Sequence, residues 1–223
     1  ARSGIIPIPK TQDTAGPMGR TVTDVAILLS VLAGADEKDE ATKGNADKIK
    51  KDYTQFLKND GLKGTRIGIE KSFLTGHEGI VSLYKNAINQ LKELGAEIIG
   101  IELLRDLRSI GSASSTVLQC EFKDGINSYL KTADAKVKKL TDIIAFNKEN
   151  EDRAMPYFKQ ETLETSDKAA NLNSDVYKKA LESVISSRKI IADLMAKNKL
   201  DAIAGTSFGI PSLIDLFNGD YSN

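Results

Sequence analysis

The sequence has very few of the residues that common active sites are built from. One cysteine, Cys120, and one histidine, His77, stand among 223 residues. A single cysteine excludes an internal disulfide and a cysteine-rich zinc site, and a single histidine excludes a site that needs two. A serine–histidine–aspartate triad would have to use His77. The glycines on both sides of His77 favour an exposed loop at this position. We expect Cys120 to be a small packing residue, and we predict no metal and no cofactor.

Long apolar runs and an excess of one charge are also missing. No apolar run approaches the roughly 20 residues that span a bilayer, so we predict no membrane partner. The 31 basic residues balance the 31 acidic ones, which leaves no global positive field to hold nucleic acid. No signal peptide opens the chain, and the compartment we expect is the cytoplasm. The chain begins at Ala1 instead of Met, and we expect its natural start to be missing.

What remains is an ordinary globular composition. Hydrophobic residues make up 40% and charged residues 28% of the chain. These fractions exclude collagen, low-complexity disorder and coiled-coil rods. We find no internal repeat and no flexible linker, and we predict a single α/β domain over residues 1–223.

Two segments carry clear secondary-structure signals. Thr21 and Asp24 stand three residues apart at the start of an apolar helical stripe, which is the spacing of a capping box. Residues 66–70 and 97–103 alternate like strands on either side of a helical pattern over residues 80–94. A strand, a helix and a strand in this order form a βαβ unit, so part of the sheet is parallel.

The rest of the chain is mainly helical. Ile5–Pro9 suits an extended edge segment, because two prolines break it. Further helices are expected over four stretches, residues 114–130, 140–147, 158–166 and 174–197. A last strand over residues 200–204 leads into a loop over residues 205–223. The predicted fold class is therefore α/β, with a mixed, partly parallel sheet flanked by helices and with both chain ends cut from a larger fold.

Four stretches near the amino terminus resemble the amidase signature family. They are Ser3–Pro7, Thr11–Met18, Arg20–Ala26 and Leu32–Asp36. The later half, including Glu121–Lys123 and Leu200–Ala202, is similar as well. The tripeptide Gln12–Asp13–Thr14 looks more like the general amidases than like the subunits of transfer-RNA amidotransferases.

The resemblance implies hydrolysis of an amide by a serine, a bridging cis-serine and a lysine. In that family all three residues lie upstream of the segment that matches Ala1. This sequence contains no Gly-Gly-Ser run. The most similar stretch, Gly111–Ser115, lies at a different position in the chain, and the residues around it do not resemble the family. We therefore expect no catalytic residue in the chain and no activity of the chain alone.

The candidate site residues are of two kinds. Gln12, Asp13 and Thr14 form the signature loop, in which Asp13 either fastens the loop or also shapes the active site above it. Thr206 and Ser207 follow a strand, where they either make a turn or form a wall of the substrate pocket.

Arg188 is the third substrate-binding candidate. It falls on an apolar helical stripe, where it either orients the substrate or pairs with an acid, Glu121 or Glu161 being the expected sources. Glu121 itself is otherwise expected to be a solvated flank residue.

Three interpretations of the function stay open. The first is the carboxyl-terminal part of an amidase that takes a small-molecule amide as substrate. The second is a non-catalytic scaffold or binding module, and the third is one component of a transfer-RNA-dependent amidotransferase. Under the first interpretation, unpaired strand edges lead us to expect self-association.

Overall fold

The computed structural model describes residues 3–44 and 46–207. Its strands are β1 (Arg66–Glu70), β2 (Glu97–Ile101) and β3 (Ala202–Ala204). Its helices are α1 (Val22–Leu32), α2 (Glu40–Lys43), α3 (Glu78–Glu93), α4 (Leu103–Leu107), α5 (Gly111–Thr132), α6 (Leu140–Glu149), α7 (Glu151–Ala154), α8 (Glu161–Lys168) and α9 (Asp175–Asn198). Short 3₁₀ turns lie at Ala46–Lys48, Thr54–Phe56, Lys71–Leu74 and Arg108–Ile110.

The sheet has the strand order β2-β1-β3, and both pairs of strands are parallel. The predicted βαβ unit is confirmed, with α3 packed on the sheet. Its core is formed by Ile67 and Ile69 of β1, Tyr84 and Ile88 of α3, and Ala96, which precedes β2. Within residues 3–44 and 46–207, no further strand pairs with the outer edge of β2 or of β3.

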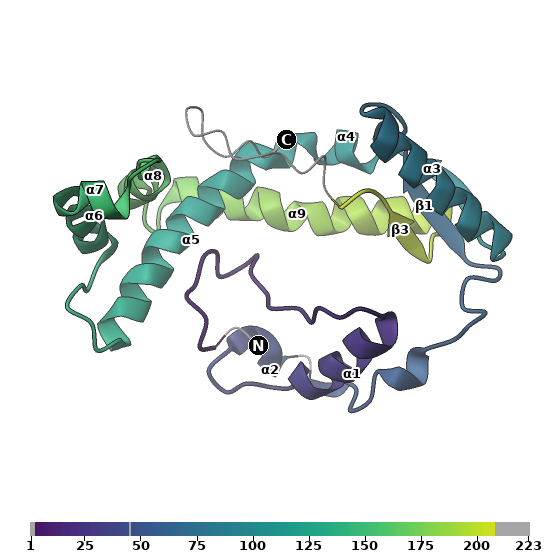
Figure 1. Cartoon of the computed structure of the whole chain (residues 1–223), viewed down its shortest axis with the longest axis horizontal. Helices are drawn as coiled ribbons and strands as arrows, with labels where there is room; N and C mark the ends of the chain where they lie inside the picture. Colours follow the sequence, from purple (N-terminus) through teal and green to yellow (C-terminus); the bar gives the residue numbers. More distant parts are fainter. Residues whose placement is uncertain (1–2, 45, 208–223) are drawn as a thin grey trace.

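A layer of helices continues from the sheet. In Figure 1, α5 and α9 run side by side, with α3 and the strands at one end and α6, α7 and α8 at the other. Val117 and Cys120 of α5 pack against Tyr177 and Ala180 of α9, and a second cluster joins α5 to α6 around Leu140. The α/β class, with a parallel sheet flanked by helices, is therefore confirmed.

Helix ends follow the sequence signals. Thr21 and Asp24 form the predicted capping box of α1, and Ser174 caps α9. The second strand is shorter than predicted because the backbone turns into α4 at Leu103. Most of the expected loop over residues 205–223 lies outside the described residues.

One expectation was wrong and another is confirmed. Ile5–Pro9 forms no strand, because Pro7 and Pro9 lack N–H groups and the N–H of Ile8 bonds to Asp13 instead of a neighbouring strand. Cys120 is buried between α5 and α9, as expected of a small packing residue. Burial raises the pKa of its thiol, so the residue is a packing group rather than a nucleophile.

Candidate functional site

In the amino-terminal loop, residues 3–20, the segment 7–12 lies along one face of α5. The Nε2 group of Gln12 donates to Oγ of Ser114 at 2.8 Å. Two turns further along the helix, the backbone N–H of Thr11 donates to Oε2 of Glu121 at 2.8 Å. The two helix positions are seven residues apart, which places them on the same face.

A glycine lets this loop approach α5 closely. Gly125 stands four residues after Glu121, and a Cβ atom at this position would lie 3.1 Å from Cγ of Pro7. That distance is tighter than an ordinary carbon–carbon contact, so any side chain here would push the loop away. Shape and hydrogen bonds thus fix the loop on α5 together.

Glu121 is the centre of this arrangement. Its side chain is only 2% exposed. Oε2 accepts hydrogen bonds from both N–H and Oγ1 of Thr11, and Oε1 accepts one from the Tyr177 hydroxyl at 2.6 Å. Burial, and then the bond to the Glu121 carboxylate, raise the pKa of the Tyr177 phenol. One buried carboxylate therefore joins the loop, α5 and α9.

A cavity of about 650 Å³ lies between the loop and α5. The residues of the loop side are mainly apolar, and include Ile5, Ile6 and Ile8. Those of the helix side are mainly polar, and include Glu121, Asp124 and Ser128. An apolar wall facing a few polar groups is the lining that binds small organic molecules.

Of the predicted signature-loop residues, Asp13 and Thr14 line this cavity, whereas Gln12 turns to Ser114. The carboxylate of Asp13 accepts the N–H of Ile8 at 2.9 Å, and its own N–H donates to the carbonyl of Pro9 at 3.0 Å. The fastening role of Asp13 is confirmed. Its role in shaping an active site stays a prediction.

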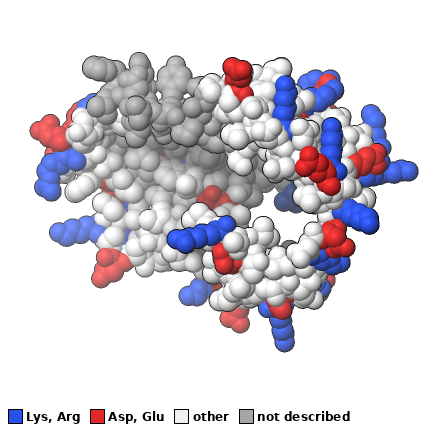
Figure 2. Space-filling view, turned by 45° about the vertical axis from the view of Figure 1, so that its right-hand side comes forward, with Lys and Arg blue, Asp and Glu red and all other residues white. Residues whose placement is uncertain are grey.

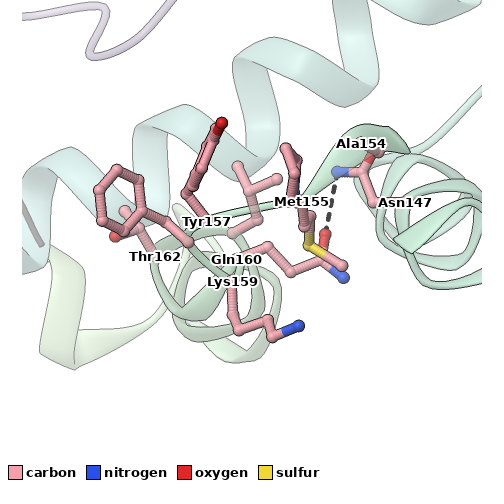
Figure 3. Close-up of a pocket in the computed structure, with 10 residues that line it drawn as sticks. Asn147, Ala154, Met155, Tyr157, Lys159, Gln160 and Thr162 are labelled. Carbon is pink, nitrogen blue, oxygen red and sulfur yellow. Dashed lines mark hydrogen bonds between the residues drawn. The ribbon is translucent and has the colours of Figure 1, made fainter. Parts of the chain in front are cut away.

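A second cavity, of about 370 Å³, lies among α6, α7 and α8 (Figure 3). Gln160 is buried there, and both ends of its amide form a hydrogen bond: Oε1 accepts from Nδ2 of Asn147 and Nε2 donates to the carbonyl of Ile144, both at 3.0 Å. Because both ends of the amide serve the protein, Gln160 fastens the segment before α8 to α6.

The carboxyl end of the sheet holds one buried acid. Glu70 ends β1 and is 4% exposed, and its carboxylate accepts the N–H groups of Ser72 and Leu104. The Tyr84 hydroxyl lies within hydrogen-bond distance of two carbonyls beside it, those of Glu70 and Ala204, and shares its one proton between them. These bonds hold β1, β3 and the start of α4 together at the edge where α/β sheets bind ligands.

Thr206 and Ser207 follow β3 at that edge, as the sequence predicts. Thr206 is half-buried and Ser207 is exposed, and neither lines either cavity described above. The structure thus places them together with each other but apart from the signature loop. Their role in substrate binding stays a prediction.

The expected pairing of Arg188 was wrong. Arg188 is exposed on α9, and no acid among the described residues forms an ion pair with it. Glu121 bonds to Thr11 and Tyr177 instead, and Glu161 is exposed on α8. The turn of α9 that carries Arg188 is not covered by α5, as the 48% exposure of Ile185 shows, so the guanidinium needs no buried partner.

Sequence reasoning also missed the role of Glu121. Two signals could have found it. Glu121 stands four residues after Val117 and next to Cys120, on the buried face of α5, where a carboxylate must be hydrogen-bonded. Tyr177 lies on the apolar stripe of the partner helix, and a buried phenol needs an acceptor.

Two kinds of site are not found in the part of the chain that the structure describes. No group of three or more histidine, cysteine, aspartate or glutamate residues there could hold a metal ion. None of the helices described combines the length and the apolar character needed to cross a membrane.

Comparisons with known proteins agree with each other. The amidase family model matches residues 1–213. A probable amidase of Arabidopsis thaliana is 34% identical over 222 residues, which are 96% of this chain and 42% of the relative. A glutamyl-tRNA(Gln) amidotransferase subunit of Lawsonia intracellularis is 43% identical over 105 residues, which are 46% of this chain and 21% of that relative.

The fold has a solved counterpart. The native peptide amidase from Stenotrophomonas maltophilia superposes with a TM-score of 0.84 at 36% identity, over 91% of this chain and 42% of that chain. The chain therefore spans less than half the length of each of these proteins.

Proposed function

This chain belongs to the amidase family, and on that premise we propose that it forms part of an enzyme that hydrolyses the C–N bond of a small carboxamide. The observation that carries the proposal is the match of the amidase family model to residues 1–213. The anchored loop supports it, because a loop held at Ser114, Glu121 and Gly125 is a rigid wall for a site.

In this proposal the chain contributes substrate-binding residues, and the catalytic residues lie outside it. The family resemblance puts the serine, the cis-serine and the lysine upstream of Ala1. The chain therefore supplies walls of the substrate-binding site and does not supply the nucleophile. Thr206 and Ser207 are the proposed substrate contacts, because the carboxyl ends of parallel strands are where α/β folds bind ligands. Arg188, with its exposed guanidinium, is proposed to orient the substrate or to contact the rest of the enzyme.

A direct assay tests this proposal. The complete reading frame that contains these residues is expected to release ammonia from a panel of aliphatic and aromatic carboxamides, and the 223-residue chain alone is expected to release none. The chain alone could hydrolyse a carboxamide, and one Ser→Ala change within it could abolish that activity. This result would refute the claim that the nucleophile lies outside the chain. A complete reading frame that hydrolyses no amide would favour the non-catalytic scaffold.

The amidotransferase interpretation is the second candidate. It is supported by the 43% identity to the amidotransferase relative, but that likeness covers only 46% of the chain. Under this interpretation, ammonia release from glutamine would rise on addition of glutamyl-tRNA and the remaining components of the amidotransferase. Hydrolysis of simple carboxamides without such partners favours the general amidase.

A further inference from the structure

The cavity between the amino-terminal loop and α5 carries an excess of acidic groups. Two lysines line it, Lys10 and Lys38, together with five carboxylates, those of Asp13, Asp39, Glu40, Glu121 and Asp124. The excess is local, because the chain as a whole holds equal numbers of acidic and basic residues. In Figure 2, basic and acidic side chains are interspersed over the face shown. The cavity therefore favours positive charge, whereas the chain as a whole has no such preference.

One of these carboxylates is free to bind a ligand. The other four already accept hydrogen bonds from the chain itself: those of Asp13, Asp39, Glu40 and Glu121. Asp124 is exposed, and among the described residues no group forms a hydrogen bond or an ion pair with its carboxylate. A cation in the cavity would therefore find an acceptor in Asp124 without breaking a bond of the protein.

Asp124 lies next to the buried Glu121. It stands three residues after Glu121 on α5, and residues at this spacing are neighbours on the surface of a helix. Burial is the main cause that raises the pKa of Tyr177, the Glu121 carboxylate is the next, and the charge of Asp124 adds to both. Because two like charges at this spacing repel each other, a bound cation would relieve the repulsion. Ser128 adds a hydroxyl four residues further along the same helix face.

The opposite wall of the cavity suits an alkyl group. Ile5, Ile6 and Ile8 line it, and their side chains are between 48% and 59% exposed. An alkyl chain lying against them would remove apolar surface from water on both sides. The cavity volume of about 650 Å³ is typical of sites for small organic molecules. A ligand that joins an ammonium group to a short alkyl chain therefore satisfies both walls.

We propose that this cavity binds the amine-bearing end of the substrate, so that the carboxamide hydrolysed under the function proposed above, on which this inference rests, also carries a protonated amine. Asp124 accepts hydrogen bonds from the ammonium group, and the isoleucines contact the alkyl chain. Ser3 and Gly4 belong to the wall as well, and they are the described residues nearest in sequence to the catalytic residues implied upstream of Ala1. An anionic amide is disfavoured because the carboxylates repel it.

Binding to the full 223-residue chain tests the charge preference. The probe is ε-aminocaproamide, which carries a protonated amine and a carboxamide at the two ends of a short alkyl chain. Heptanamide is its neutral counterpart, in which a methyl group replaces the ammonium group. Calorimetric titration measures both dissociation constants. We expect ε-aminocaproamide to bind about fivefold more tightly, which is the size of effect that one partly exposed charge pair produces.

A substitution at Asp124 locates the binding site. Asp124→Asn keeps the size of the side chain and removes its charge, and it should reduce the preference to less than about twofold. Asp193→Asn is the matched control, because Asp193 on α9 is 64% exposed and does not line the cavity. It should leave the fivefold preference unchanged. Circular dichroism checks that both variants stay folded, as their exposure leads us to expect.

Three results would overturn the inference. The two amides could bind equally tightly, or Asp124→Asn could keep the full preference. Asp193→Asn could also remove the preference, which would show that the cation is attracted by the surface in general and not by the cavity.

Failure of the proposed function would look different. The complete reading frame could release ammonia from no carboxamide while the preference at Asp124 holds. That result would refute the proposed function and leave the cavity as a binding site for an organic cation. Release of ammonia from carboxamides without any preference for ε-aminocaproamide in binding would refute the inference alone.

Discussion

Helices α1 and α3 show how differently two parts of one chain are covered. In α3, Tyr84 and Ile88 face the sheet and are buried, while Leu83 faces outward. In α1, Ala26 is buried and apolar residues are exposed on all sides. The α3 pattern needs one neighbouring layer and has it in the sheet. The α1 pattern needs several neighbours, and the described element that packs most extensively on it is the short turn Thr54–Phe56.

The largest expected effect compares the two helices directly. Ile88→Ala should lower the free energy of unfolding by about 2–5 kcal/mol, since it leaves a cavity under the sheet. Val31→Ala on α1 should change it by less than about 0.5 kcal/mol, because this side chain is 78% exposed. Urea denaturation measures both. Equal losses would show that α1 is covered as fully as α3 in solution.

The next effect concerns the bond that ties the amino-terminal loop to the helical layer. Tyr177→Phe should cost about 1.5–3 kcal/mol, because the buried Glu121 carboxylate loses a charged hydrogen bond while the ring packing is kept. Tyr157→Phe is the control, since Tyr157 is 66% exposed. The comparison would fail if thermal unfolding responded to both changes alike.

The stability of the chain at alkaline pH provides a second test of the Tyr177–Glu121 hydrogen bond. The pKa of Tyr177 is raised above the unfolded value of about 10, so the folded state holds the phenol proton more tightly. The associated stability is fully present below pH 10 and is lost as the pH rises towards the folded pKa, by about 1 kcal/mol between pH 10 and 11. Tyr84 and Cys120, whose pKa values are also raised, add to the decline.

Tyr177→Phe isolates the contribution of one phenol to that decline. Its stability should fall less steeply between pH 10 and 11 than that of the unchanged chain, and urea titrations at the two pH values give the difference. Identical slopes would mean that Tyr177 ionises equally easily in both states.

The smallest effect tests whether α1 has local signals of its own. Thr21→Ala removes the capping bond to the N–H of Asp24, and should raise hydrogen exchange in the first turn by an amount that corresponds to about 0.5–1 kcal/mol. Global unfolding should hardly change, because α1 is weakly coupled to the sheet. Ser174→Ala, at the start of the well-packed α9, should instead lower global stability. If both changes acted globally, α1 would belong to the same cooperative unit as α9.

Much of the fold could be predicted, because its signals are local. The alternation of residues 66–70, the helical period of α3 and the capping box of Thr21 and Asp24 are each set by neighbours in the sequence. The extended edge segment expected at Ile5–Pro9 pairs with no strand, since Pro7 and Pro9 lack N–H groups and the side chain of Asp13, outside the segment, takes the N–H of Ile8.

The candidate site could be predicted less well. The signature loop was found by its residues, and Asp13 was correctly expected to fasten it. The hydrogen bond from Thr11 to Glu121 joins residues 110 positions apart. The periodic pattern of apolar residues within α5 cannot predict such a contact. Arg188 was misjudged because a helical stripe shows which residues share a face and not which turns of that face another helix covers.

The position of β1 in the middle of the sheet sets the order in which the chain can fold. The N–H of Arg66 bonds to the Asp201 carboxylate across 135 residues, and β3 cannot pair with β1 until that stretch has been made. At the usual rates of synthesis, β1 therefore waits on the order of 10 s on the ribosome with one edge open. In that interval β1, α3 and β2 are available to form the βαβ unit from residues near one another in the sequence, and the pairing of β3 with β1 is the last step in closing the sheet.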